Sequence, residues 1–178
     1  MHRGSNVVFL LTFKQIPSQE WREEGGTMFV RETDLFKGMS QEFMTELGKI
    51  MDEKSYQEGN FLFKEGDTAD YFYVLEEGRV KMSIGGRGHI ITIVSDSGEA
   101  FGWSSLVGRE TYTASAECLV PCRLIRIEKE KMNKLFEKHL TDGVIFYKHL
   151  AGIVGQRLIN SYNSLLSAQP GETIPSYG

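Results

Sequence analysis

Cysteine, histidine and proline are all scarce in this sequence of 178 residues. The two cysteines, Cys118 and Cys122, lie four positions apart on a segment that the pattern predicts to be one strand. Same-face cysteines of one strand favour core packing over a disulfide bond, which indicates a reducing, cytoplasmic setting. The histidines show no two-histidine spacing suited to a metal ion, and we predict no metal site. They are His2, His89, His139 and His149.

Neither a strong positive charge nor a long apolar run is present. The 20 basic and 24 acidic residues give a net charge of -4, which argues against a nucleic-acid partner. The apolar run over residues 7–13 is far shorter than the roughly 20 residues that span a bilayer, so we expect no membrane partner. Ser104 and Ser105 have no identifiable base or orienting acid beside them, and nothing else looks catalytic. We predict a protein that is not an enzyme.

Short strand-like segments separated by glycine turns fill the middle of the chain. Residues 71–75 are aromatic and β-branched, as strands prefer, and residues 79–84 alternate polar with apolar side chains. A glycine-rich hairpin tip over residues 85–88 joins this segment to a returning strand at 89–94. Strands of this length and spacing indicate an all-β sandwich or roll.

Helices are predicted on both sides of the strands. Ser40 is a suitable N-cap for a helix whose apolar residues recur at helical spacing. Residues 128–140 form a second helix, and Thr141 caps a long helix that runs to about residue 168. We assign residues 28–168 to one domain, residues 1–27 to an extension that is disordered or packs on a neighbour, and residues 169–178 to a tail.

The stretch over residues 101–116 has the composition of a ligand-binding turn. It joins an aromatic residue and a glycine to two adjacent serines, a short apolar pair and a polar loop. Glycine lets the backbone approach a ligand closely, and successive backbone N–H groups followed by hydroxyls can form an anion cradle.

This stretch resembles the phosphate-binding cassette of cyclic nucleotide-binding domains. The family pattern reads Phe-Gly-Glu-x-Ala-Leu, then a short loop, then Arg-Ser/Thr-Ala or Arg-Ala-Ala. The positions that fit it are Phe101, Gly102, Leu106, Thr113 and Ala114. The resemblance covers roughly residues 35–166. It implies an antiparallel double-stranded β-helix, or jelly roll, of the catabolite-activator type, mainly β with α, flanked by N-terminal helices and a long C-terminal helix.

Two positions depart from the family pattern. Trp103 stands where the family places the glutamate that holds the ribose 2′-hydroxyl, and Tyr112 where it places the arginine that pairs with the cyclic phosphate. Tyr112 can donate only one neutral hydrogen bond. Arg109 is either a substitute cation or a solvated loop charge. Trp103 is either a stacking platform or a core aromatic. For the two serines and the threonine, lining a polar pocket and capping a short helix are compatible roles.

The residues predicted to contact a ligand are therefore Phe101, Gly102, Trp103, Ser104, Ser105, Arg109, Tyr112, Thr113 and Ala114. We predict no cofactor other than the ligand itself, which is a cyclic nucleotide or another small anionic or aromatic molecule.

The predicted C-terminal helix carries two apolar stripes, which is more than one face needs. The first steps by three and four, close to a heptad seam, through Tyr147, Ala151, Val154, Leu158, Tyr162 and Leu165. The second contains Phe146, Leu150 and Ile153. We interpret the first stripe as a parallel homodimer interface and the other stripe as the face that covers the roll. The alternative is one helix buried on two sides within a monomer.

Three functions follow from these patterns. The chain is a non-enzymatic ligand sensor, a ligand-free dimerising interaction module, or a transcription factor of the same family. The third would need two further helices to read DNA, and only residues 169–178 follow the long helix. We therefore expect the output to pass through a protein partner.

Overall fold

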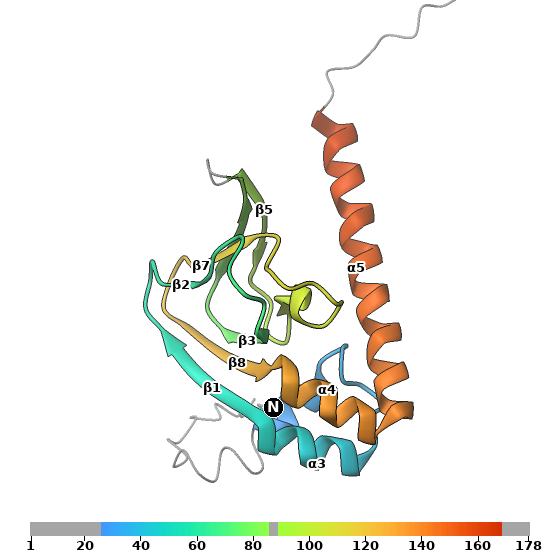
Figure 1. Cartoon of the computed structure of the whole chain (residues 1–178). Coiled ribbons are helices and arrows are strands. Elements are labelled where there is room, and N and C mark those ends of the chain that lie inside the picture. Colours follow the sequence, from blue (N-terminus) through green and yellow to red (C-terminus); the bar gives the residue numbers. More distant parts are fainter. Residues whose placement is uncertain (1–25, 86–88, 169–178) are drawn as a thin grey trace, which may run out of the picture.

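The computed structural model describes residues 26–85 and 89–168 (Figure 1). The predictions for residues 1–25, for the hairpin tip at 86–88 and for the tail at 169–178 concern residues outside the described ranges. In chain order the elements are α2 (Gly26–Glu32), α3 (Gln41–Ile50), β1 (Met51–Tyr56), β2 (Phe61–Phe63), β3 (Tyr71–Glu77), β4 (Val80–Ile84), β5 (His89–Val94), β6 (Ala100–Phe101), the 3-10 turn η2 (Trp103–Ser105), β7 (Ser115–Cys118), β8 (Cys122–Glu128), α4 (Lys129–Lys138) and α5 (Leu140–Ala168).

The strands form two four-stranded antiparallel sheets. One has the order β1-β8-β3-β6 and the other β2-β7-β4-β5. Strand β3 supplies the predicted aromatic and β-branched run, and five consecutive residues of it are buried. Because β8 pairs with β1 on one side and β3 on the other, residues far apart in the sequence share one sheet. The predicted jelly roll flanked by helices is confirmed.

Two clusters of buried apolar side chains hold this arrangement together. One lies between the helices and the sheet that contains β3, and it includes Phe36, Phe43 and Phe146. The other fills the roll, where Tyr73 and Phe101 stack at 5.3 Å between ring centroids. Each fully buried side chain of this size contributes about 1.5–3 kcal/mol relative to exposure, so both clusters are major sources of stability.

The first predicted helix begins as the sequence indicates. The Ser40 hydroxyl accepts a hydrogen bond from the Phe43 amide at 3.2 Å, which makes it the N-cap of α3. Ser40 also donates its amide and its hydroxyl to the Asp142 carboxylate, at 2.7 and 2.8 Å. The start of α3 is thus attached to the first turn of α5.

The predicted cap of the long helix is one place where the structure differs. Helix α5 begins at Leu140, so Thr141 lies inside it and does not cap it. The Gly143 amide donates to the His139 carbonyl at 2.9 Å, and the helix begins two residues before the start that a Thr141 cap would give.

The predicted single strand through both cysteines is also wrong. Cys118 ends β7 in one sheet, and Cys122 begins β8 in the other. Pro121 lies between them without an amide hydrogen for a strand ladder, and the chain changes sheets there. Both thiols are buried and free of a disulfide, so the predicted packing role holds, and the Cys122 thiol also donates to the Val120 carbonyl at 3.2 Å. Burial is the main cause that raises the pKa of the Cys118 thiol, and Cys122 adds to it.

Helix α5 has two different halves. Its first half covers the protein with Phe146 and Leu150, which are buried, and with the partly buried Ile153. Its second half runs beside the roll and extends past the helical layer (Figure 1). Among the described residues, none of the helices combines the length and apolar character needed to cross a bilayer.

Candidate functional site

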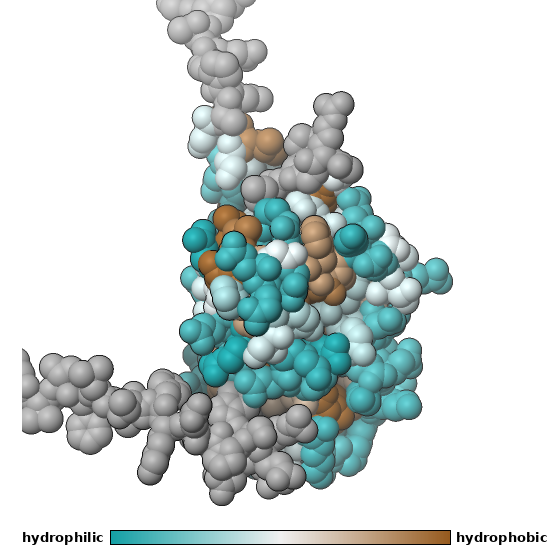
Figure 2. Space-filling view, turned by 90° about the vertical axis from the view of Figure 1, so that its left-hand side faces the viewer, coloured by the Kyte–Doolittle hydropathy of each residue, from teal (hydrophilic) through white to brown (hydrophobic). Residues whose placement is uncertain are grey.

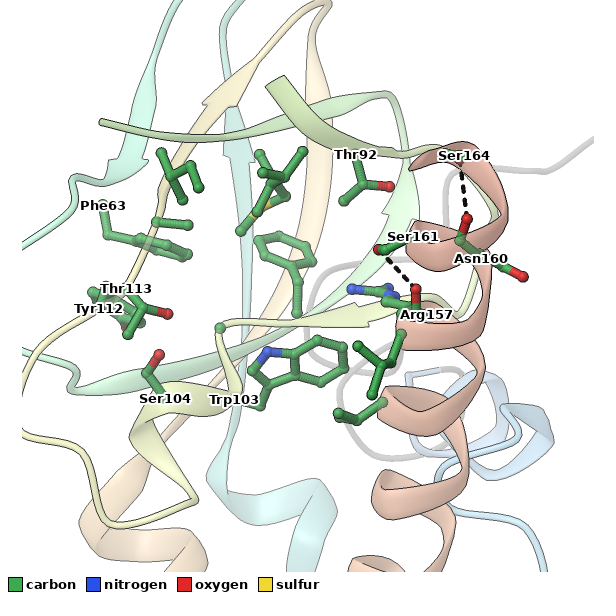
Figure 3. Close-up of a pocket in the computed structure, with 18 of the residues that line it drawn as sticks. Phe63, Thr92, Trp103, Ser104, Tyr112, Thr113, Arg157, Asn160, Ser161 and Ser164 are labelled. Carbon is green, nitrogen blue, oxygen red and sulfur yellow. Dashed lines mark hydrogen bonds between the residues drawn. The ribbon is translucent and has the colours of Figure 1, made fainter. Parts of the chain in front are cut away.

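A cavity of about 900 Å³ lies between the roll and the second half of α5 (Figure 3). Its walls come from β2, β4, β5, the segment from β6 through η2 to β7, and α5. The lining residues are Phe63, Met82, Ile84, Ile91, Thr92, Phe101, Gly102, Trp103, Ser104, Tyr112, Thr113, Ala114, Val154, Arg157, Leu158, Asn160, Ser161, Ser164 and Leu165. Seven of the nine residues predicted to contact a ligand are therefore brought together around one space.

Gly102 adopts a backbone conformation that a side chain would oppose. Its φ of 77° is left-handed, and a Cβ there would lie 3.0 Å from the Tyr73 ring and 3.2 Å from the Tyr71 carbonyl oxygen. The turn it starts places Trp103 and Ser104 at the floor of the cavity (Figure 3). Gly102 therefore permits a close backbone approach, but the close neighbour in this structure is strand β3 and not a ligand.

Ser105 does not line the cavity. Its hydroxyl and its amide both donate to the Gly102 carbonyl, at 3.0 and 3.2 Å, and its side chain is buried. Ser105 is the last residue of η2, whose N-cap is Gly102, so the Ser105 hydroxyl neither lines the cavity nor caps the turn. Ser104, in contrast, lines the cavity, and so does Thr113.

The Tyr112 hydroxyl is engaged by the protein itself. It donates to the Tyr71 carbonyl at 2.6 Å and accepts from the Tyr71 amide at 3.0 Å. Its ring stacks on Phe63 with centroids 3.7 Å apart, and burial raises the pKa of the phenol to about 12. Tyr112 therefore presents an uncharged aromatic surface to the cavity, and its only donor is already used.

Arg109 is not the cation of this site. It lies in an exposed loop that spans residues 107–111, and it is not among the lining residues. The prediction that it contacts a ligand stays a prediction, although this structure does not place its side chain on the cavity wall. The solvated loop charge is the interpretation that fits.

Arg157 of α5 is the cation that the sequence analysis missed. Its guanidinium carbon lies 4.5 Å from the centroid of the Trp103 ring, a cation–π arrangement. One of its nitrogens forms an ion pair with Glu99 and donates to the Ala100 carbonyl at 3.1 Å. Burial lowers the pKa of Arg157, and the Glu99 charge opposes this shift. No sequence pattern marked Arg157, because its partners are distant in the chain and meet it only through the packing of α5.

The α5 wall adds small polar groups. The Ser161 hydroxyl donates to the Arg157 carbonyl at 2.9 Å, and the Ser164 hydroxyl donates to the Asn160 carbonyl at 3.0 Å (Figure 3). These hydroxyl oxygens keep lone pairs as acceptors, while their hydrogens are used within the helix. Among the described residues that line the cavity, Arg157 is the one with a formal charge.

The stripe predicted to form a dimer interface is divided by this geometry. Val154, Leu158 and Leu165 line the cavity, whereas Ala151 and Tyr162 do not. The Tyr147 hydroxyl donates to the Leu106 carbonyl at 3.1 Å, next to the turn that carries Trp103. Other large apolar residues of α5, among them Ile159 and Leu166, are exposed away from the cavity lining.

Comparison with known sequences identifies relatives of this region. Residues 53–139 match the family model described as the cyclic nucleotide-binding domain. The cGMP-dependent protein kinase egl-4 of Caenorhabditis elegans is 27% identical over 111 residues, which is 60% of this chain and 14% of that kinase. The chain thus spans only a small part of the curated relatives it matches.

Comparison with solved structures agrees with the fold. A protein of Geobacter metallireducens GS-15, described provisionally as a cyclic nucleotide-binding protein, has 29% identity and a TM-score of 0.65, covering 72% of this chain and 95% of that one. A cyclic nucleotide-binding domain of Methylobacillus flagellatus KT has 22% identity and a TM-score of 0.70, covering 86% and 89%. The second likeness supports the fold alone.

Proposed function

On the premise that residues 53–139 match the cyclic nucleotide-binding domain family, we propose that the chain is a non-enzymatic sensor with an altered ligand preference. The observation that carries the proposal is the Tyr112 hydroxyl, which is bonded on both sides to the Tyr71 backbone. In the family this position holds the arginine that pairs with the cyclic phosphate. An engaged, uncharged phenol cannot replace that pairing.

The charge balance of the cavity supports the same proposal. Arg157 already pairs with Glu99 and lies over Trp103, so a phosphate would have to compete with both groups. Loss of a charge-assisted bidentate contact in a desolvated site costs about 2–5 kcal/mol. This corresponds to roughly two to three decades in affinity or more. Cyclic nucleotides are then weak ligands.

The ligand class follows from the groups that remain. Trp103, Tyr112 and Phe63 offer aromatic surface, and the hydroxyls of Ser104, Thr92 and Thr113 offer a few polar contacts. We infer a planar molecule that is neutral or weakly anionic. It would touch the roll and α5 together, and a ligand that prefers one position of α5 shifts the helix toward it. The output then reaches a protein partner, in a cytoplasmic setting.

The test compares charged and neutral forms of one ring system. Adenosine and guanosine, with cyclic AMP and cyclic GMP, are titrated into the full chain by calorimetry and by thermal shift. We expect neither cyclic nucleotide to bind more tightly than its nucleoside. A cyclic nucleotide that binds at least about tenfold more tightly would contradict the altered preference. If none of the four changes the melting temperature at high concentration, the sensor proposal fails for this ring class.

Restoring the family residues gives the converse test. The double variant Trp103→Glu with Tyr112→Arg should gain cyclic nucleotide affinity, because it supplies the missing acid and base. Circular dichroism must confirm that the variant folds, since Tyr112→Arg removes two hydrogen bonds and a stacked ring. Tyr112→Phe is the matched control: it loses the same hydrogen bonds and should gain no affinity. A folded double variant without any gain would contradict the proposed arrangement of the cavity.

A second candidate function is a ligand-free dimerising module. The observation that favours it is the apolar surface of the second half of α5, where Tyr162 and Leu166 are 55% and 69% exposed. The opposite side of the molecule is mainly hydrophilic, with hydrophobic residues in small separate groups (Figure 2). A parallel two-fold pairing of α5 would bury this surface.

Tyr162→Glu tests the dimer without disturbing the cavity, because Tyr162 does not line it. We expect light scattering to give the mass of two chains for the unmodified protein and of one chain for the variant. Asn163→Glu adds the same charge at the neighbouring exposed position and should leave the mass unchanged. An unmodified protein of monomer mass would contradict the dimer.

A further inference from the structure

Three side chains with metal-binding chemistry meet outside the cavity. Glu42 and Glu46 lie one turn apart on α3, and His139 is the C-cap of α4. One ligand atom from each residue lies within 4.8 Å of those from the other two. None of the three lines the cavity beside α5, so this cluster is independent of the proposed ligand site.

His139 supplies the observation that makes this more than an acidic cluster. Its side chain is only 9% exposed, and its Nε2 atom is buried without a hydrogen-bond partner. That atom faces Glu46 Oε1 at 3.5 Å, at the outer limit of a hydrogen bond. Phe43 holds the imidazole edge-on, with centroids 5.8 Å apart at 90°. Buried polar atoms are nearly always paired, so an unpaired ring nitrogen that faces Glu46, with Glu42 in the same cluster, indicates a missing partner.

We propose that Glu42, Glu46 and His139 bind a divalent transition-metal ion, with Zn²⁺ as the best match. One imidazole nitrogen and two carboxylate oxygens are ligands that zinc accepts, and a water molecule would complete a four-coordinate site. The imidazole favours zinc and its neighbours over magnesium and calcium, which prefer oxygen alone. The sequence pattern predicted no metal site because it contains no paired histidines, whereas the proposed site uses a single histidine.

Lys138 is the competitor of the ion. Its ammonium pairs with Glu46, and its side chain is 57% exposed. A flexible, exposed lysine can leave the carboxylate and enter solvent when a divalent ion arrives. Removal of Lys138 should therefore strengthen metal binding, an effect that loss of an ordinary structural ion pair would not produce.

The site would link helix α3 to the junction of α4 and α5. The bonds from Ser40 to Asp142 already connect α3 to the start of α5. A metal held by two residues of α3 and by His139 would add a second link between α3 and the α4–α5 junction. Zinc that binds the folded state and not the unfolded state raises the melting temperature by mass action.

The experiment is a Zn²⁺ titration of the full chain by calorimetry, after treatment with a chelator. We expect one ion per chain, no competition from millimolar Mg²⁺, and a rise in melting temperature. Glu42→Gln should weaken binding at least about tenfold, as loss of a metal-supporting contact commonly does. Because Glu42 is exposed, this change should not disturb folding. Lys138→Gln should bind zinc more tightly than the unmodified chain.

The control is Glu137→Gln, which removes an exposed carboxylate beside Lys138 and outside the cluster. It should leave zinc affinity unchanged. Equal zinc affinity in Glu42→Gln and the unmodified chain would assign the ion to other groups, such as the two thiols, and would overturn the proposal. Absence of zinc binding, or weaker binding by Lys138→Gln, would overturn it as well.

Discussion

At the scale of single residues, Glu76 of β3 is a buried carboxyl group whose ionisation lowers the stability of the folded state. Its side chain is 8% exposed, and one carboxylate oxygen has no hydrogen-bond partner. Burial is the main cause that raises its pKa from 4.5 to about 7, and the nearby Glu53 charge raises it further. The folded state therefore binds this proton more tightly than the unfolded state. Stability from the protonated form is fully present below about pH 4.5 and is lost as the pH rises to about 7.

Glu76→Gln should remove this loss. We expect the variant to be more stable than the unmodified chain at pH 8, by about 3 kcal/mol, and nearly equal to it at pH 4.5. Urea unfolding at both values measures the difference. Glu58→Gln removes an exposed carboxylate in a turn and should change little at either pH. A variant that is less stable than the parent at pH 8 would mean that the ionised carboxylate has a stabilising partner.

The sequence pattern predicted most of the cassette residues that line the cavity, but not the hydrogen bonds that these residues form. Gly102, the aromatic residues and the hydroxyls of Ser104 and Thr113 could be placed from their pattern, because the cassette is continuous in sequence, whereas Ser105 could not. The partner of the Tyr112 hydroxyl could not, since Tyr71 lies on another strand and meets it only in the folded roll. The same reason left Arg157 unnoticed and made Arg109 the apparent cation.

At the scale of elements, Arg157 attaches the second half of α5 to the roll. It contacts Trp103, Glu99 and the Ala100 carbonyl, all on the segment that begins at β6 or just before it. The apolar residues around it on α5 are largely exposed, so few other contacts hold this part of the helix. Arg157→Gln should therefore loosen it while the first half stays in place.

We expect Arg157→Gln to lower local stability by about 1–2 kcal/mol, which corresponds to roughly 5- to 30-fold faster amide exchange in residues 154–168. Hydrogen exchange with mass spectrometry measures it. The region around Phe146 and Leu150 should exchange as before, because those side chains are buried. Gln156→Ala changes the adjacent exposed residue and serves as control. Unchanged exchange would show that other contacts hold the helix.

Element types followed from the sequence better than element boundaries and partners. Period-two segments became strands, and the apolar stripe through Phe146 and Leu150 became the buried face of α5. The segment through Cys118 and Cys122 was misjudged, because a chain that crosses from one sheet to the other keeps its alternating pattern on both sides of the turn. Alternation reports burial of one face and says nothing about which sheet the strand joins.

At the scale of the whole molecule, the helical layer is assembled from both ends of the domain. Helix α3 precedes the roll, and α4 and α5 follow it, yet their aromatic side chains form one cluster in which Phe43 stacks on Phe136 at 6.1 Å. Ser40 and Asp142 provide the polar link between the same two ends. The family resemblance predicted helices on both sides of the roll, but their mutual contacts depend on a chain closure that local patterns do not record.

Asp142→Ala tests whether this link stabilises the entire domain. The carboxylate accepts two hydrogen bonds from Ser40 and is 7% exposed, so its removal leaves the amide and hydroxyl of Ser40 without their charged acceptor. Hydrogen bonds to charged groups contribute about 1.5–3 kcal/mol each, and we expect a loss of about 3 kcal/mol in the free energy of unfolding. Urea unfolding followed by far-ultraviolet circular dichroism measures it.

Thr141→Ala is the control that separates the sequence-based start of α5 from the observed one. Replacement of a true N-cap lowers the free energy of unfolding by about 1 kcal/mol, whereas replacement of an exposed residue inside the helix should leave it unchanged. A large loss in Thr141→Ala with little in Asp142→Ala would place the start of α5 where the sequence pattern put it and would remove the proposed link between the two ends of the domain.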